Sequence, residues 1–214
     1  KYGNTISRLK MKLLNKVIGI ILRDFYISLR NFSEVLTSLI FFFLSIFVFI
    51  FSIGPNNEIL QFTGVGILWS LLLLSSTLSL KKYYQMDFDN DSIIIIHMSG
   101  LSYEFLSFLK IISHFIFVYI PFLISIPLAC LLINLDIEKL FSLLISFFIG
   151  SLILSCIGSI SSAMNLLNKR NFSLGSIIVM LFSIPVIIFS VGIVNSSNNF
   201  IALLNILLGI FFIF

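Results

Sequence analysis

Long runs of apolar residues dominate the chain, and short polar segments separate them. Six of these runs contain no Lys, Arg, Asp or Glu, and most are long enough for an α-helix to cross the ~30 Å hydrocarbon core of a bilayer. They are Leu36–Ile53, Gly64–Leu80, Ile111–Ile133, Leu140–Leu167, Phe172–Val194 and Phe200–Phe214. Because the runs are continuous rather than alternating, they predict an all-α integral membrane protein with six transmembrane helices. The sequence ends inside the sixth run, so we expect the last helix to be truncated.

The composition agrees with this pattern. The 214 residues are 59% hydrophobic and only 10% charged, whereas an ordinary soluble domain has about 25% charged residues. The 13 Lys and Arg and the 9 Asp and Glu are too few to cover the surface of a water-soluble globule. The composition therefore excludes a soluble enzyme, a nucleic-acid-binding domain and a disordered tail.

Basic residues predict the orientation of the spans. If the N-terminus is cytoplasmic, all 13 Lys and Arg residues except Lys139 lie on the cytoplasmic side, which is the side that positively charged loops prefer. Six spans then return the C-terminus to the cytoplasm. We expect a multi-pass protein of a bacterial inner membrane. A mitochondrial inner membrane is the alternative, because the 25 phenylalanines suggest an AT-rich genome and some mitochondrial genomes are AT-rich.

Residues 1–35 form a predicted cytoplasmic segment before the transmembrane domain, residues 36–214. From Leu14 to Phe32, apolar side chains follow one face of a helix and basic side chains follow the opposite face. The basic residues include Lys12, Lys16, Arg23 and Arg30. This pattern predicts an amphipathic helix in the membrane interface, with its basic side toward anionic lipid headgroups. A cytoplasmic helix packed on a partner is the alternative interpretation.

The longest polar segment is the predicted cytoplasmic loop 81–110. Any partner that moves the spans from the cytoplasm must contact this loop, because the other predicted connections are short. The loop combines acidic residues, which would steer it toward a basic groove, with apolar residues, which would anchor it there. The predicted coupling residues are Asp87, Phe88, Asp89, Asp91 and Ile93.

The chain offers few groups for catalysis. It contains no Gly-x-x-x-x-Gly-Lys-Ser/Thr loop, so it does not bind and hydrolyse ATP by that mechanism. His114 is the one ionisable side chain inside a span, and such residues are candidates for function because their burial is costly. One interpretation of His114 is a packing role, and the other is a contact with haem or another ligand. Two histidines in different parts of the chain do not make a metal site, so we predict no catalytic residue and no bound metal.

Prolines interrupt two of the predicted spans. Pro121 and Pro127 lie in the third span, and Pro185 lies in the fifth. Each removes a backbone N–H from its helix and predicts a kink. Two prolines in one span predict a bent or broken helix, which can shape a cavity or a hinge.

Four short motifs lie at the end of the first predicted span, at the start and in the middle of the second, and at the start of the third. They are Phe51-Ser52-Ile53-Gly54-Pro55, Gly64-Val65-Gly66-Ile67-Leu68-Trp69, Leu71-Leu72-Leu73-Leu74-Ser75-Ser76 and Lys110-Ile111-Ile112-Ser113-His114. Together with the polar loop after the second span, they resemble the haem exporter protein B family, the CcmB-type permease of the cytochrome c maturation system. The resemblance extends from about Met11 to the end of the sequence.

The resemblance implies the membrane subunit of an ABC transporter with the type-2 exporter permease fold. Two copies of such a subunit pair with two ATPase subunits, and they associate with a haem-handling membrane subunit, a small helical subunit and a haem chaperone. ATP hydrolysis in the partner would drive release or delivery of the haem-loaded chaperone during cytochrome c-type biogenesis. ATP is therefore expected in the partner and haem in the complex, with His114 the only candidate contact in this chain.

Two other functions fit the same sequence pattern. One is an ABC permease of the same fold that exports a lipid, a polysaccharide or a drug. The other is a membrane assembly scaffold that transports nothing. A co-purifying ATPase would argue against the scaffold, and bound haem proteins would argue against the general exporter.

Overall fold

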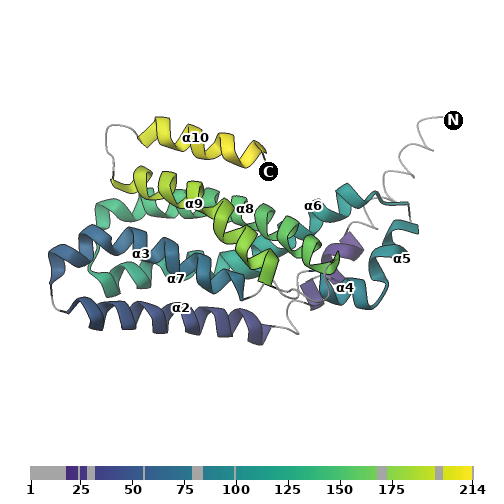
Figure 1. The fold of residues 1–214 in the computed structure, drawn as a ribbon, viewed down its shortest axis with the longest axis horizontal. Coiled ribbons are helices and arrows are strands. Elements are labelled where there is room, and N and C mark those ends of the chain that lie inside the picture. The colour runs from purple at the N-terminus through teal and green to yellow at the C-terminus, as the bar shows by residue number, and fades with distance from the viewer. Residues whose placement is uncertain are drawn as a thin grey trace.

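The computed structural model describes residues 18–23, 25–27, 32–54, 56–78, 84–98, 100–167, 173–195 and 200–213. Within these ranges every regular element is a helix (Figure 1). The elements are α2 (Phe32–Ile53), α3 (Asn57–Thr77), α4 (Gln85–Asp89), α5 (Ser92–Met98), α6 (Tyr103–His114), the π-helical η2 (Phe115–Tyr119), α7 (Ile120–Ile133), α8 (Ile137–Leu167), α9 (Ser173–Asn195) and α10 (Phe200–Ile213). Helical residues 18–23 and 25–27 precede α2, and we name them the N-terminal helical segment.

Five helices are long and apolar enough to span a membrane: α2, α3, the continuous helix Tyr103–Ile133, α8 and α9. Each coincides with a predicted span, so the structure confirms a multi-pass helical protein. The sixth predicted span coincides with α10, which packs on α9 and has 14 described residues, a length of ~21 Å. The sixth span and the type-2 exporter fold stay predictions.

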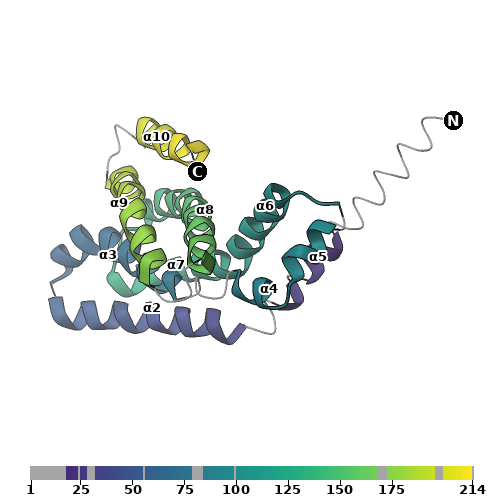
Figure 2. The ribbon, with the colours of Figure 1, turned by 45° about the vertical axis from the view of Figure 1, so that its right-hand side comes forward.

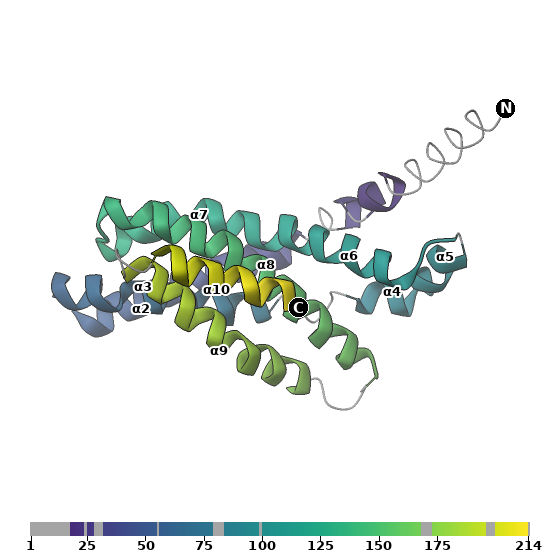
Figure 3. The ribbon, with the colours of Figure 1, turned by 90° about the horizontal axis from the view of Figure 1, so that it is seen from above.

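The long helices lie side by side in one bundle (Figure 3), and Figure 1 shows α2 at one edge of it and α10 at the opposite edge. A single apolar cluster fills the bundle between them. Its largest fully buried side chains include Phe42, Trp69, Tyr119, Phe122 and Phe147. Many phenylalanine, leucine and isoleucine side chains face outward, which is typical of a surface in contact with lipid rather than water.

The third spanning helix begins at Tyr103, not at Ile111, where the apolar run begins. Ser102 caps this helix, because its hydroxyl oxygen accepts a hydrogen bond of 3.3 Å from the backbone N–H three residues later. The added turns bury two leucines on one side, which hydropathy alone does not detect. The predicted loop 81–110 therefore contains α4, α5 and the start of α6, and Lys110 lies within a helix.

The third span changes helix type immediately before Pro121. α6 and α7 are joined without a break through η2, which has π-helical geometry. A proline has no N–H for the carbonyl four residues earlier, and this favours such a local change. α7 and α9 stay helical through Pro127 and Pro185. Only the first of the three prolines thus coincides with a change of helix type, and kinks at the other two stay predictions.

The N-terminal helical segment lies beside α4, α5 and α6 at one end of the bundle (Figure 2). Its exposed side chains are apolar: Ile18, Ile21, Leu22, Phe25 and Tyr26. On its other side, Ile20 is buried in a small cluster with Leu101, Leu106 and Leu109. Arg23, which was predicted to face lipid headgroups, is partly exposed and pairs with Asp87 of α4. The position of this helix at the membrane surface stays a prediction, and Lys12, Lys16 and Arg30 lie outside the described residues.

Candidate partner-docking site

α4 and α5 are two short helices joined by a tight turn. Asp91 lies in this turn with a φ of 52°, a left-handed conformation that aspartate tolerates better than most residues. The backbone N–H groups of Ile94 and Ile95 both bond to the carbonyl of Asp91, at 3.1 and 3.2 Å. Asp91 therefore ends one helix and starts the next, and the turn fixes the two helices as a pair.

The pair exposes four large apolar side chains, Phe88, Ile94, Ile95 and Met98, together with the carboxylates of Asp89 and Asp91. We name these six residues the exposed α4–α5 surface. The side-chain amide of Gln85 donates to both carboxylate oxygens of Asp89, at 2.9 and 3.1 Å, and holds that charge in place. Apolar area beside negative charge suits a partner groove with an apolar floor and a basic rim.

The structure divides the predicted coupling residues into two groups. Phe88, Asp89 and Asp91 are exposed, and they stay candidates for partner contact. Asp87 is only 3% exposed, and Ile93 packs against the cluster around Ile20. The expectation that Asp87 steers a partner is wrong, because its carboxylate is already paired within the chain. Ile94, Ile95 and Met98 were not predicted as contact residues, although a helix through the apolar run 93–96 must turn some of the side chains of that run outward.

The carboxylate of Asp87 lies between two cations. One oxygen accepts a hydrogen bond from the guanidinium of Arg23, in the N-terminal helical segment, and the other pairs with the ammonium of Lys110, in α6. A buried carboxylate is costly unless such partners neutralise it. Asp87 therefore joins α4 to two other helical elements.

Hydroxyl groups on α8 attach the same region to the bundle. The hydroxyl of Tyr84 lies 2.8 Å from Oγ of Ser159, and both are buried. Oγ of Ser155 donates to the carbonyl of Ile111 at 3.0 Å and lies 3.2 Å from Nδ1 of His114. The hydroxyl of Ser155 thus joins two groups of α6, the carbonyl of Ile111 and the imidazole of His114. Packing between α6 and α8 therefore accounts for the position of His114, and its contact with haem stays a prediction.

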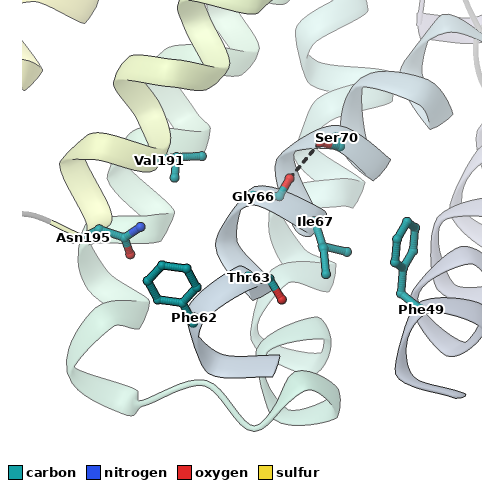
Figure 4. A pocket seen from close by; sticks show the side chains of 8 residues that line it. All are labelled: Phe49, Phe62, Thr63, Gly66, Ile67, Ser70, Val191 and Asn195. Carbon is teal, nitrogen blue, oxygen red and sulfur yellow. Dashed lines mark hydrogen bonds between the residues drawn. The ribbon is translucent and has the colours of Figure 1, made fainter. Parts of the chain in front are cut away.

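An open groove of about 490 Å³ lies between α2, α3 and α9 (Figure 4). It is lined by Phe49, Phe62, Thr63, Gly66, Ile67, Ser70, Val191 and Asn195. The hydroxyls of Thr63 and Ser70 bond to carbonyls of their own helix, at 2.7 and 2.8 Å, so the groove offers mainly apolar surface. None of the lining residues is His, Cys, Met or Tyr, the side chains that ligate haem iron. Within the described residues, no group of His, Cys, Asp and Glu could hold a metal ion.

These features define a multi-pass helical membrane protein that carries an exposed pair of short helices at one end of its bundle. The chain belongs to the CcmB protein family, whose family model matches residues 15–213. The match confirms the resemblance seen in the sequence.

Curated relatives share more than a quarter of their aligned residues with this chain. Heme exporter protein B of Haemophilus influenzae is 30% identical over 163 residues, which cover 76% of this chain and 74% of the relative. Heme exporter protein B of Pseudomonas aeruginosa is 27% identical over 168 residues, which cover 78% and 75%. That of Bradyrhizobium diazoefficiens is 30% identical over 162 residues, which cover 76% and 73%.

Proposed function

We propose that this chain is the membrane permease subunit of an ABC transporter that serves haem export and cytochrome c maturation. The observation that carries the proposal is membership of the CcmB family along nearly the whole chain, with relatives named heme exporter protein B. The chain acts as a non-catalytic subunit, and a partner ATPase supplies the work of ATP hydrolysis. The remaining partners are a second copy of the chain, a haem-handling membrane subunit, a small helical subunit and a haem chaperone.

The exposed α4–α5 surface is the contact for the ATPase in this proposal. Its apolar residues provide area that is buried on binding, and Asp89 and Asp91 provide charge for steering. The type-2 exporter fold, with α10 as part of a sixth span, completes the proposed subunit. The N-terminus and the α4–α5 pair lie in the cytoplasm of a bacterial cell, beneath the inner membrane.

Cysteine labelling tests this orientation. Asn57, at the start of α3, and Asp89, at the end of α4, are both exposed, and we place them on opposite sides of the membrane. In intact cells, a membrane-impermeant maleimide is expected to modify Asn57→Cys and to spare Asp89→Cys, because charged reagents do not cross the bilayer. Both variants should react after detergent is added. Labelling of Asp89→Cys in intact cells would contradict the proposed orientation.

Co-purification tests the proposed ATPase contact. Phe88 is 44% exposed, and its ring is the aromatic anchor of the surface. We expect Phe88→Ala to weaken ATPase retention by about 2 kcal/mol, roughly thirtyfold, because anchors at the centre of an interface carry most of its energy. Asp89→Ala should weaken it mainly at low salt, because exposed charges act on association and are screened. The measurement is the amount of ATPase that co-elutes with tagged chain at two salt concentrations.

Phe51→Ala is the matched control, because Phe51 is an exposed phenylalanine near the end of α2 and belongs to no part of the exposed α4–α5 surface. This variant should retain the ATPase at the wild-type level. The contact is assigned wrongly if Phe88→Ala and an Asp89→Ala/Asp91→Ala variant both retain it fully. Loss of haem-dependent cytochrome c maturation in cells that lack the chain tests the function itself.

A further inference from the structure

Three helical elements meet at the side chain of Asp87. Arg23 reaches it from the N-terminal helical segment, Lys110 reaches it from α6, and Asp87 itself belongs to α4. We name Arg23, Asp87 and Lys110 the Asp87 lock. Each carboxylate oxygen has a cation of its own, so the one carboxylate holds two elements at once.

We propose that Asp87 is a positioning residue, which joins α4, the N-terminal helical segment and α6 into one rigid unit. When a partner displaces the exposed α4–α5 surface, this unit transmits the displacement to η2. The proposal rests on the proposed function in one respect: a partner ATPase supplies the force that displaces this surface. Asp87 itself contacts no partner in this role, because its side chain is buried.

Two routes connect the lock to η2. Lys110 lies on α6, which continues without a break into η2 at Phe115. Arg23 lies near Phe25 on the N-terminal helical segment, and the ring of Phe25 contacts the ring of Phe117 in η2, with centroids 5.3 Å apart. Both cations of the lock therefore lie on elements that reach the same π-helical turn.

The contacts inside this unit differ in kind from those that hold it to α8. Inside the unit, the lock consists of charge-assisted bonds to a buried carboxylate. Toward α8, the unit bonds through uncharged groups: Tyr84 with Ser159, and His114 with Ser155. Charged hydrogen bonds are roughly twice as strong as neutral ones. A load on α4 therefore shifts the unit against α8 before it separates the parts of the unit.

η2 is the element able to yield to such a shift. A π-helical turn is rare, and such turns are frequently found at functional sites. In this chain it precedes Pro121, which cannot supply the N–H that an α-helix would direct to the carbonyl of Phe117. When α6 moves, the helix can therefore change conformation at η2, because this turn already departs from α geometry.

Hydrogen exchange of the purified chain in lipid nanodiscs tests the lock without any partner. Arg23→Gln and Lys110→Met should each raise exchange in 84–98 by less than about threefold, because one cation still pairs with the carboxylate. The double variant should raise it by about tenfold or more, because a buried charge is then left unpaired. Adding Asp87→Asn to the double variant should bring exchange back below about threefold. Equal effects of the single and double variants, or no rescue, would overturn the lock.

Asp87→Asn in the whole complex tests transmission to η2, with Asp136→Asn as the matched control, because Asp136 is an exposed aspartate between α7 and α8 and belongs to no part of the exposed α4–α5 surface. We expect Asp87→Asn to retain the ATPase and its ATP hydrolysis while cytochrome c maturation falls about tenfold or more, whereas Asp136→Asn keeps normal maturation. Normal maturation in Asp87→Asn would overturn the transmission role.

The two experiments also separate this inference from the proposed function. If the wild-type chain retains no ATPase, the proposed function is wrong, and the exchange comparison still decides whether the lock exists. If the ATPase is retained but the exchange pattern fails, the lock is wrong and the proposed function stands. If Asp87→Asn fails to insert into the membrane, the Arg23→Gln and Lys110→Met variants and their combination test the transmission role in the complex. We then expect maturation to be lost only in the double variant, and normal maturation in the double variant would overturn the role.

Discussion

Gly150→Ala is expected to destabilise the bundle by about 1–3 kcal/mol, although it adds only one methyl group. Gly150 lies on α8 where the ring of Trp69, on α3, crosses it. A Cβ atom at Gly150 would lie 3.0 Å from Cζ3 of Trp69 and closer still to Cη2. The ring cannot move away easily, because Trp69 is fully buried and packs on Phe147 with centroids 4.3 Å apart. Thermal unfolding of the purified chain in detergent measures the loss.

Gly66→Ala is the control for this substitution. Gly66 is also a helical glycine, but a Cβ atom there would meet no heavy atom within 4 Å. This variant should be neutral or more stable by up to about 1 kcal/mol, because alanine favours a helix over glycine. Trp69→Phe should relieve part of the cost in the Gly150→Ala variant. Equal midpoints for Gly150→Ala and Gly66→Ala would show that α3 and α8 do not approach each other so closely.

Phe42→Ala is expected to cost about 3–5 kcal/mol, a larger loss of stability than that expected for Gly150→Ala. Phe42 is 0% exposed, and its ring meets the ring of Phe122 on α7 edge to face, with centroids 5.4 Å apart and planes at 88°. Removing it leaves a cavity between α2 and α7 and removes an aromatic pair. The folded fraction recovered by size-exclusion chromatography after heating measures the effect.

The same substitution at Phe51 provides the comparison. Phe51 also lies on α2, but its side chain is 81% exposed, so alanine there removes no internal contact. We expect Phe51→Ala to shift the midpoint little. A similar loss in both variants would mean that α2 gains its stability from lipid contact rather than from packing on α7.

The spans were predictable from the sequence because a bilayer leaves few choices. A backbone in hydrocarbon must satisfy its own hydrogen bonds, so a long apolar run becomes a helix. The ends of the helices were less predictable. α6 begins at Tyr103 because Ser102 caps it and because two of its leucines pack on Ile20, and that contact joins segments far apart in the sequence.

The role of Asp87 shows why the candidate site was only partly predictable. In the sequence, Asp87, Asp89 and Asp91 are equivalent members of one acidic patch. In the structure, only Asp87 is buried, because the chain brings Arg23 to it from 64 residues away. Composition identified the segment as the main surface outside the spans, but tertiary contacts decide which of its charges faces outward.

The π-helical turn η2 has a consequence for the direction in which α6 can move. An α-helix turns by about 100° for each residue. One residue more or less in a turn therefore changes the direction in which the side chains beyond that turn point. Conversion of η2 to α geometry would therefore rotate α6 about its own axis by an angle on the order of 100°, with α7 held in the bundle by Phe122 and Ile126. Such a rotation carries Lys110 around the helix axis, so the geometry of this turn sets which way its ammonium group points.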